Sequence, residues 1–204
     1  MADILAVLYG GEEFIFKAIY DPEQLRKVLT KITRFYIEVM EFQLSLIPDF
    51  HGGTGSFYYY LWTPHDTVWH QEDSVMLLSP TIYDEVIKPF DEQIYTHFKH
   101  NICHFHSTGG FIPYQEVLSF HPLAIEMHLD SGGPSAEALF DRHREILHTT
   151  PLMIWGKFTQ QDLDWVFSKL SPEGLALNIV VRSAEEAAKI WDAYILHPSH
   201  FPKR

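Results

Sequence analysis

The chain has 204 residues but only one cysteine, Cys103, so it cannot form an internal disulfide, which favours a cytoplasmic protein. It has no apolar run of about 18 residues, the length that suggests a membrane-spanning helix. Its first residues, "MADILAVLYGGEEF", include the acidic Asp3 and no basic leader, which argues against a signal peptide. We therefore expect a cytoplasmic protein that does not bind a membrane.

Positive charge is also scarce, since the chain has 15 Lys and Arg but 27 Asp and Glu, which gives a formal net charge of -12. Binding to the phosphates of a nucleic acid needs a basic surface, so a nucleic-acid partner is not expected. The chain is 46% hydrophobic and 15% aromatic, which is typical of a globular protein. Its length suits one domain, residues 1–204, without a linker or low-complexity segment. These features predict a globular domain whose partner is a small-molecule substrate.

Short apolar segments alternate with helical patterns along most of the chain. The segments that read as strands are "TVWHQED", "NICHFH", "LAIEMHLD", "PLMIWGK" and "GLALNIV". A helix is predicted between each strand and the next, and another after the last one. About five such strand–helix units predict an α/β fold with a parallel sheet.

The helix starts carry recognisable capping residues. Asp21 followed by Pro22 predicts the start of a long helix that ends near Pro48. Ser79-Pro80 predicts a second helix, which Pro89 should kink. Further caps are predicted at Ser135, at Thr159, and at Ser183, where Glu186 completes a capping box.

Ionisable side chains gather at the ends of three predicted strands. They are Glu72 and Asp73 after the first strand, His104 and His106 on the second, and His128 and Asp130 on the third. The carboxyl ends of parallel strands are where α/β proteins hold ligands and catalytic groups. Side chains alternate between the two faces of a strand. His104 and His106 therefore lie on the same face of their strand, and His128 and Asp130 lie on the same face of theirs, with both pairs expected to point to a common interior. We therefore take these six residues as candidate catalytic residues.

A different interpretation remains open for each of these residues. A single histidine on a strand is more often a structural residue than a ligand, so the prediction depends on the whole group. The aromatic residues of "FYYYLW", residues 57–62, would either line a pocket or pack in the core. The glycines of "HGGTG" resemble a phosphate-binding loop only weakly, because no Gly-Lys-Ser/Thr follows them.

Several stretches resemble the uroporphyrinogen decarboxylase superfamily. "QEDSVMLLSPTIYDEVIKPFDEQI" is similar to a family segment in which a strand ends in an acidic residue, a Leu-Ser-Pro helix start follows, and a Pro-Phe or Pro-Tyr pair comes next. "AIEMHLDSGGPSAEAL" is similar to the family strand that ends in an aspartate, here Asp130. "PLMIWGKFTQQDL" and "GEEFIFKAIYDPEQLRKVL" resemble two further segments, so the similarity in element order covers nearly the whole chain.

The resemblance implies a TIM-barrel (β/α)₈ fold, here a partial barrel of about five β/α units. It implies a lyase of the decarboxylase type, which acts on a porphyrinogen without a cofactor, or a corrinoid-dependent methyltransferase, which uses zinc. In the methyltransferases a His-x-Cys pattern binds zinc on the strand where this chain has His104 and His106, so these two are the expected metal ligands and zinc the expected metal. No third ligand is evident, and Glu72 and Asp130 are the candidates for it. In the decarboxylase reading, Glu72, Asp73, His104, His106, His128 and Asp130 would transfer protons or orient substrate.

The chain also departs from the family pattern. The early strands, with the arginine segment that holds substrate carboxylates in the decarboxylases, have no counterpart, and "NIVVRS" stands where a late glycine-rich loop or cysteine ligand is expected. We therefore do not expect the chain alone to decarboxylate uroporphyrinogen. Two alternatives stay open: a non-catalytic or truncated subunit that needs a partner chain, and a self-contained open sheet that binds a small ligand. Because about five strands leave two open edges, we expect a homo-oligomer or a partner chain that completes the barrel.

Overall fold

A computed structural model of the chain describes residues 1–56 and 59–196. The chain divides into two compact units. Unit 1 consists of Met1–His104 and Gly109–Leu123, and unit 2 consists of Phe105–Thr108 and Ala124–Arg204, of which the described part ends at residue 196. Each unit is described by itself below.

Unit 1 begins with three helices, α1 (Ala2–Tyr9), α2 (Gly11–Tyr20) and α3 (Pro22–Leu46). Gly10 joins the first two at a φ of 82°, a left-handed conformation that glycine adopts without steric cost. The predicted start of α3 is confirmed, since the side chain of Asp21 accepts a hydrogen bond from the backbone N–H of Gln24 at 3.4 Å. The first two helices were not recognised in the sequence.

The helix predicted from Ser79 is not a single regular helix, because it is interrupted just before Pro89. A single 3₁₀ turn, η1 (Ser74–Leu77), precedes α4 (Pro80–Ile82), a π-helical turn η2 (Tyr83–Ile87) and α5 (Lys88–His97). Pro89 lacks the N–H that a regular helix would use, and a wider π turn lies just before it, so the regular helix is interrupted next to the residue where a kink is predicted. The apolar sides of these elements form the core of unit 1, which includes Leu5, Phe14, Leu25, Leu29, Val75 and Ile87.

The strands of unit 1 form two separate pairings. A short antiparallel hairpin consists of β1 (Gly53–Ser56) and β2 (Leu61–Pro64), so the glycine-rich stretch forms a strand rather than a phosphate-binding loop. The other pair is parallel, β3 (Thr67–Gln71) beside β4 (His100–His106), with Gln71 opposite His104. The short helix α6 (Tyr114–Leu118) follows β4, as the sequence predicts.

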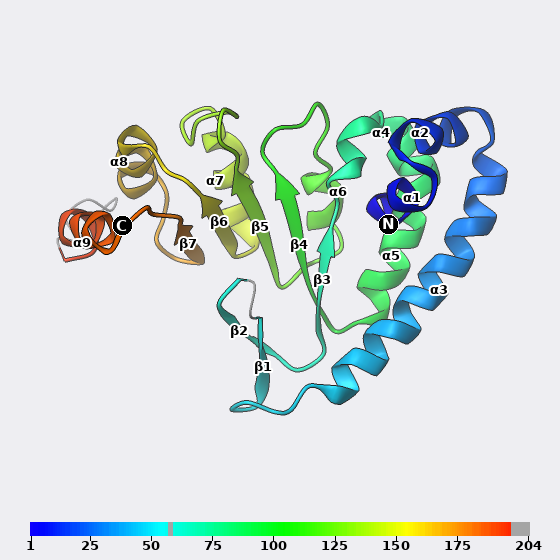
Figure 1. Cartoon of the computed structure of the whole chain (residues 1–204), viewed down its shortest axis with the longest axis horizontal. Helices are drawn as coiled ribbons and strands as arrows, with labels where there is room; N and C mark the ends of the chain where they lie inside the picture. The colour runs from blue at the N-terminus through cyan, green and yellow to red at the C-terminus, as the bar shows by residue number, and fades with distance from the viewer. Residues whose placement is uncertain (57–58, 197–204) are drawn as a thin grey trace. The chain divides into compact units, whose positions relative to one another are not determined.

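Unit 2 repeats the strand–helix alternation (Figure 1). Its strands are β5 (Ala124–Leu129), β6 (Leu152–Gly156) and β7 (Leu175–Ile179), and β6 pairs in parallel with both of the others. The helices are α7 (Phe140–Thr149), α8 (Gln160–Lys169) and α9 (Ala184–Ile190), which runs into a π turn η3 (Trp191–Ile195). The capping residues Thr159 and Ser183 are confirmed by hydrogen bonds from the N–H groups of Asp162 and Glu186. The capping box predicted at Ser183 is wrong, because the carboxylate of Glu186 accepts from the N–H of Arg182 and not from that of Ser183.

The predicted cap at Ser135 is wrong in position. The Ser135 hydroxyl accepts a hydrogen bond from the N–H of Ala138, but α7 begins only at Phe140. The residues between form a turn, and the N–H of Ala136 donates instead to the carboxylate of Asp162 at 2.8 Å. This buried contact ties the turn to the start of α8 and delays the helix.

The fold class is confirmed at the level of an α/β fold. The strand order is β3-β4-β5-β6-β7 in a five-stranded sheet that alternates with helices.

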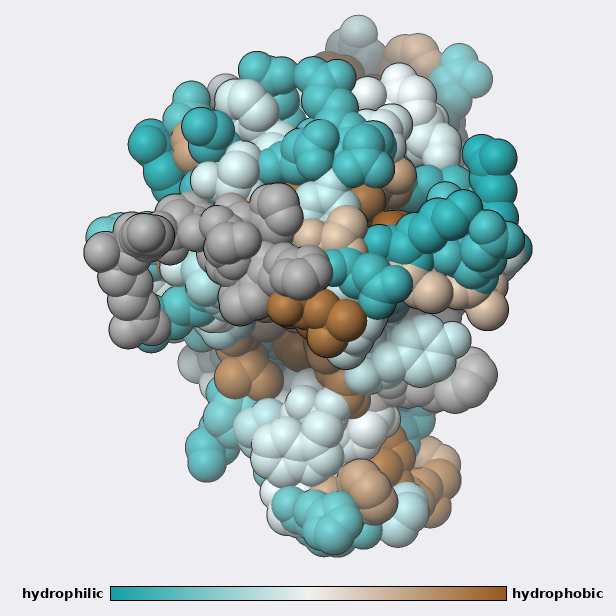
Figure 2. Space-filling model, turned by 90° about the vertical axis from the view of Figure 1, so that its left-hand side faces the viewer, coloured by the Kyte–Doolittle hydropathy of each residue, from teal (hydrophilic) through white to brown (hydrophobic). Residues whose placement is uncertain are grey.

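All residues of β7 are only half-buried, whereas most residues of β5 and β6 are buried. Large apolar side chains near the described end of the chain are exposed, namely Val180, Trp191, Ile195 and Leu196, and Figure 2 shows apolar surface exposed on the side that carries α9. Among the described helices, none has the length and apolar character needed to cross a membrane.

Candidate functional site

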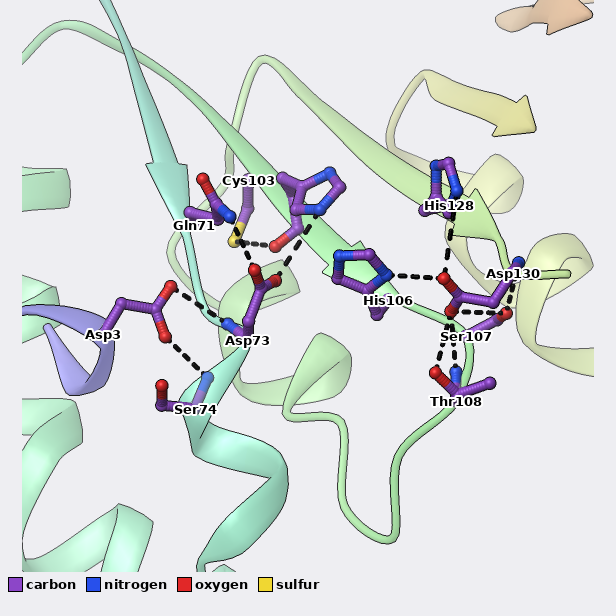
Figure 3. A network of polar contacts seen from close by, with 11 residues as sticks. Asp3, Gln71, Asp73, Ser74, Cys103, His106, Ser107, Thr108, His128 and Asp130 are labelled. Atoms are coloured by element: carbon purple, nitrogen blue, oxygen red, sulfur yellow. Dashed lines mark hydrogen bonds and ion pairs between the residues drawn. The ribbon is translucent and has the colours of Figure 1, made fainter. Parts of the chain in front are cut away.

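The end of β3 places the carboxylate of Asp73 in a network within unit 1 (Figure 3). The side-chain amide of Gln71 donates a hydrogen bond to Asp73 Oδ2 at 2.5 Å. The backbone is held by Asp3 of α1, whose carboxylate accepts hydrogen bonds from the N–H groups of Asp73 at 3.2 Å and Ser74 at 2.5 Å. A side chain far away in the sequence therefore fixes the turn from which Asp73 projects.

His104 lies on β4, beside this turn. Its imidazole is buried, and Nε2 lies 3.6 Å from Asp73 Oδ1. The ring of Tyr59 stacks on Trp69 at a centroid distance of 4.0 Å and lies 6.3 Å from the ring of His104. Of the predicted aromatic loop, Tyr59 thus packs near the candidate site, Trp62 is 52% exposed, and Phe57 and Tyr58 fall outside the described residues.

In unit 2, the carboxylate of Asp130 is the centre of a second network (Figure 3). His106 Nδ1 lies 2.6 Å from Asp130 Oδ1, a short charge-assisted hydrogen bond. Asp130 Oδ2 accepts hydrogen bonds from the Ser107 hydroxyl at 3.1 Å and from both the N–H and the hydroxyl of Thr108 at 3.0 Å. The ring of His128 adds a longer contact, with Nε2 at 3.8 Å from Oδ1.

These donors stabilise the ionised form of Asp130. Partial burial acts to raise the pKa of this carboxyl, but the hydrogen bonds from His106 and Thr108 outweigh it and lower the pKa to about 2. The N–H of Asp130 also donates to the Ser107 hydroxyl at 3.1 Å, so the backbone is held together with the side chain. A fixed negative charge therefore faces Nδ1 of His106 and selects the tautomer that carries hydrogen on that atom.

Glu72 has a different position from its neighbour in the sequence. Its carboxylate is buried in unit 1, 2.5 Å from the amino group of Met1, which also lies 2.8 Å from Asp91 Oδ1. Burial, followed by repulsion from Asp91, raises the pKa of Glu72 to about 8. Its second oxygen has no hydrogen-bond partner among the described residues. The Glu72 carboxyl is thus in contact with the Met1 amino group inside unit 1.

Three of the six predicted residues form a group that could hold a metal ion. One candidate ligand atom from each of Asp73, His104 and His106 lies within 4.8 Å of the other two. The separation of 3.6 Å between His104 Nε2 and Asp73 Oδ1 is close to the roughly 3.3 Å between two ligand atoms of a tetrahedral zinc ion. Imidazole nitrogen and carboxylate oxygen are both ordinary zinc ligands, so the donor set fits this metal.

The sequence identified the residue types at the strand ends but missed those that support them. Asp3, Gln71, Ser107 and Thr108 were not predicted to take part. Only the last two carried a signal, because the Ser-Thr pair directly follows His106 and offers hydroxyl donors. Asp3 could not have been found, because the sequence gives no sign that α1 contacts the end of β3.

Comparison with protein-family models found no match, and comparisons with curated proteins and with solved structures found no significant match. The functional argument therefore depends on the geometry of the side chains, and the resemblance to the uroporphyrinogen decarboxylase superfamily stays a prediction.

Proposed function

We propose that Asp73, His104 and His106 bind a divalent transition metal, with zinc as the first candidate, and that the chain is an enzyme that acts on a small molecule at this metal. The observation that carries the proposal is the mutual proximity of the three candidate ligand atoms. Three protein ligands are typical of catalytic zinc sites, which keep a fourth position for water or substrate. A zinc ion held in this way would polarise a substrate carbonyl or lower the pKa of a bound water to about 7.

The partner of His106 supports a metal-binding role. A histidine that binds a metal through one ring nitrogen almost always donates the N–H of its other nitrogen to a carboxylate, a carbonyl or water. Asp130 accepts from Nδ1 of His106, which leaves Nε2 as the atom for the metal. The low pKa of Asp130 keeps this carboxylate charged over the whole physiological range. In this proposal Asp130 is a positioning residue, and His128 is its second imidazole neighbour.

The family assignment is part of the proposal. We propose an enzyme-like domain of the uroporphyrinogen decarboxylase superfamily, of the decarboxylase or methyltransferase class, in the cytoplasm. The strand order supports a (β/α)₈ type of sheet, because strands β3 to β7 are neighbours in the order of the sequence. A doubly wound sheet would instead reverse its order at a switch point. The candidate metal site favours the zinc-dependent methyltransferase branch over the decarboxylases.

A second candidate function is that of a subunit completed by a partner chain. The observation that favours it is β7, a strand at one edge of the described sheet with all five residues only half-buried. Interior strands of parallel sheets are covered on both faces and paired on both sides. An edge of this kind would pair with further strands in a closed barrel.

Metal analysis of the purified chain tests the first proposal. We expect about one bound zinc per chain before treatment with a chelator, and a large loss of bound zinc in His104→Ala and in His106→Ala. His97→Ala is the matched control, because His97 also lies beside a carboxylate, 2.8 Å from Glu41, but on the exposed surface of unit 1. Unchanged zinc content in both site variants would contradict the metal site. If zinc is bound but activity needs a second polypeptide, the partner-subunit function gains support.

A further inference from the structure

Helix α3 carries an apolar stripe whose second half lies outside the core of unit 1. The stripe consists of Val28, Phe35, Val39, Phe42 and Leu46, spaced by seven, four, three and four residues. This spacing places the five side chains along one side of a helix. Val28, at the start of the stripe, packs against the core of unit 1 beside the buried Leu25 and Leu29, whereas the other four residues of the stripe are not part of that core.

The second half of α3 leaves this stripe in contact with solvent. Phe35, Phe42 and Leu46 are 65%, 63% and 66% exposed, and the buried residues of the helix all lie in its first half. Figure 1 shows α3 along the outside of unit 1, with α5 on its inner side. Two more exposed apolar residues, Ile47 and Phe50, follow the helix directly. A continuous row of large exposed apolar side chains is a mark of an interaction surface.

We propose that this stripe is a self-association surface, on which α3 of one copy of the chain packs antiparallel to α3 of a second copy. The pattern of the stripe fits helix-to-helix packing. Phe35, Val39, Phe42 and Leu46 are spaced by four, three and four residues, which is the spacing of the contact positions in a coiled coil. Such positions interlock with those of a facing helix rather than with a flat surface.

The charges of α3 select the antiparallel orientation. In its first part the basic residues Arg26, Lys27, Lys31 and Arg34 outnumber the single acidic residue Glu23, whereas Glu38 and Glu41 lie in its second part and Asp49 follows it. An antiparallel pair places the basic part of each helix beside the acidic part of the other, and it also opposes the helix dipoles. A parallel pair would set like charges side by side. Because α3 carries nearly balanced charge in a chain of net charge -12, it is a region where two copies meet with little repulsion.

The expected dimer is weak, because a single pair of helices is a small contact. Stable interfaces bury roughly 1,200–2,000 Å² in total, and transient ones bury less. At 1.5 Å per residue the 25 residues of α3 extend for about 37 Å, which is enough for a continuous seam but not for a large interface. Association should therefore depend on protein concentration.

Sedimentation velocity of the full chain over a dilution series tests the proposal. We expect the wild type to pass from the 23.8 kDa monomer to the dimer as the concentration rises. Phe42→Lys should weaken the dimer at least tenfold without changing the fold, because this side chain is exposed in the monomer. Val7→Lys is the matched control, since Val7 is an apolar residue of α1 that is 84% exposed and lies off the stripe, and this variant should dimerise as the wild type does.

A charge exchange tests the orientation. Lys31→Glu should weaken the dimer, because it adds an acidic group opposite the acidic part of the second helix, and the double variant Lys31→Glu with Glu38→Lys should restore association. A monomer at all concentrations would overturn the proposal, as would a dimer that Phe42→Lys leaves unchanged, which would mean that another surface, such as a sheet edge, makes the contact. A stronger dimer in the single variant Lys31→Glu would overturn the antiparallel orientation.

Discussion

Glu72 and Asp130 each follow the end of a strand, but their surroundings shift their pKa values in opposite directions. Burial in unit 1 and repulsion from Asp91 raise the pKa of Glu72 to about 8. In unit 2 partial burial acts to raise the pKa of Asp130, but hydrogen bonds from His106 and Thr108 outweigh it and lower the pKa to about 2. The comparison teaches that a carboxylate at a strand end is suited to orient a histidine only where donors surround it. On this ground we propose Asp130, and not Glu72, as the carboxylate that orients His106.

The largest expected effect is on metal affinity in Asp130→Ala. This variant removes the acceptor of His106 Nδ1, and the loss of such a partner typically weakens metal binding 10- to 100-fold. We expect a loss of about 100-fold in a zinc competition titration, with a smaller loss in Asp130→Asn, which keeps a hydrogen-bond acceptor. Asp141→Asn, an exposed change in the same unit, should leave the affinity unchanged. Equal affinities for Asp130→Ala and the wild type would remove the role given to Asp130.

The substitution Glu72→Gln tests the raised pKa of Glu72 through the pH dependence of stability. A carboxyl whose pKa is raised on folding contributes stability that is fully present below its unfolded pKa and is lost as the pH rises through its folded pKa. Because the pKa of this carboxyl is 4.5 in the unfolded chain and about 8 in the folded protein, wild-type stability should fall between these pH values by an amount on the order of 1–3 kcal/mol. The variant is neutral throughout and should lose less. Urea unfolding at pH 5 and pH 8 measures the change in the free energy of unfolding for each protein. An equal change in the wild type and in Glu72→Gln would contradict the raised pKa of Glu72.

Two histidines of unit 2 also differ in their surroundings, and the expected effect on stability is smaller. His106 is bonded to Asp130, whereas His143 on α7 is fully buried and neither ring nitrogen has a hydrogen-bond partner among the described residues. Burial, aided by Arg142, lowers the pKa of His143 to about 4. Because the unfolded chain binds a proton here near pH 6.5 and the folded chain does not, stability is lost as the pH falls from 6.5 towards 4.

His143→Leu should therefore stabilise the protein, by about 1 kcal/mol at pH 7 and by more at pH 5. The gain at pH 7 comes from removing a buried polar ring without partners, and the extra gain at pH 5 comes from removing the proton linkage. His148→Leu, at an exposed position of the same helix, is the control and should change stability little at either pH. Thermal unfolding at the two pH values gives the result, and a destabilised His143→Leu would show that the ring has a partner.

The smallest expected effect is that of Asp3→Ala. This change removes the carboxylate that accepts the N–H groups of Asp73 and Ser74, which should cost about 1 kcal/mol of stability. Because Asp73 then projects from a less fixed turn, zinc affinity should fall by a few-fold, whereas Asp21→Ala, which removes the cap of α3, should affect stability alone. Loss of stability in both variants with equal zinc affinity would limit Asp3 to a structural role.

Local patterns in the sequence predicted much of the α/β fold. The five strands, the start of α3 at Asp21 and the caps at Thr159 and Ser183 follow from periodicity and capping chemistry within a few residues. The start of α7 was misplaced because its turn is held by Asp162, which lies 26 residues away from Ala136. Helices α1 and α2 were missed.

The candidate site was predictable only in part, for the same reason. Strand alternation placed His104 and His106 on one face, and the strand ends identified Asp73 and Asp130. The sequence also placed Glu72 in this group because of its position at a strand end. In the structure, Glu72 and Asp91 of α5 both contact the amino group of Met1, and no local pattern in the sequence indicates this contact. Contacts between elements that are distant in the sequence thus decided which carboxylate we propose for the candidate site.

X-ray absorption spectroscopy at the zinc edge of the purified, zinc-loaded chain tests the central claim most directly. The account predicts a first shell of nitrogen and oxygen only, with the imidazole signature of two histidines, which falls to one in His104→Ala and in His106→Ala. Burial raises the pKa of the Cys103 thiol well above its usual value, which disfavours the thiolate that zinc requires. A sulfur atom in the first shell, or two histidines that persist in both variants, would contradict the site formed by Asp73, His104 and His106.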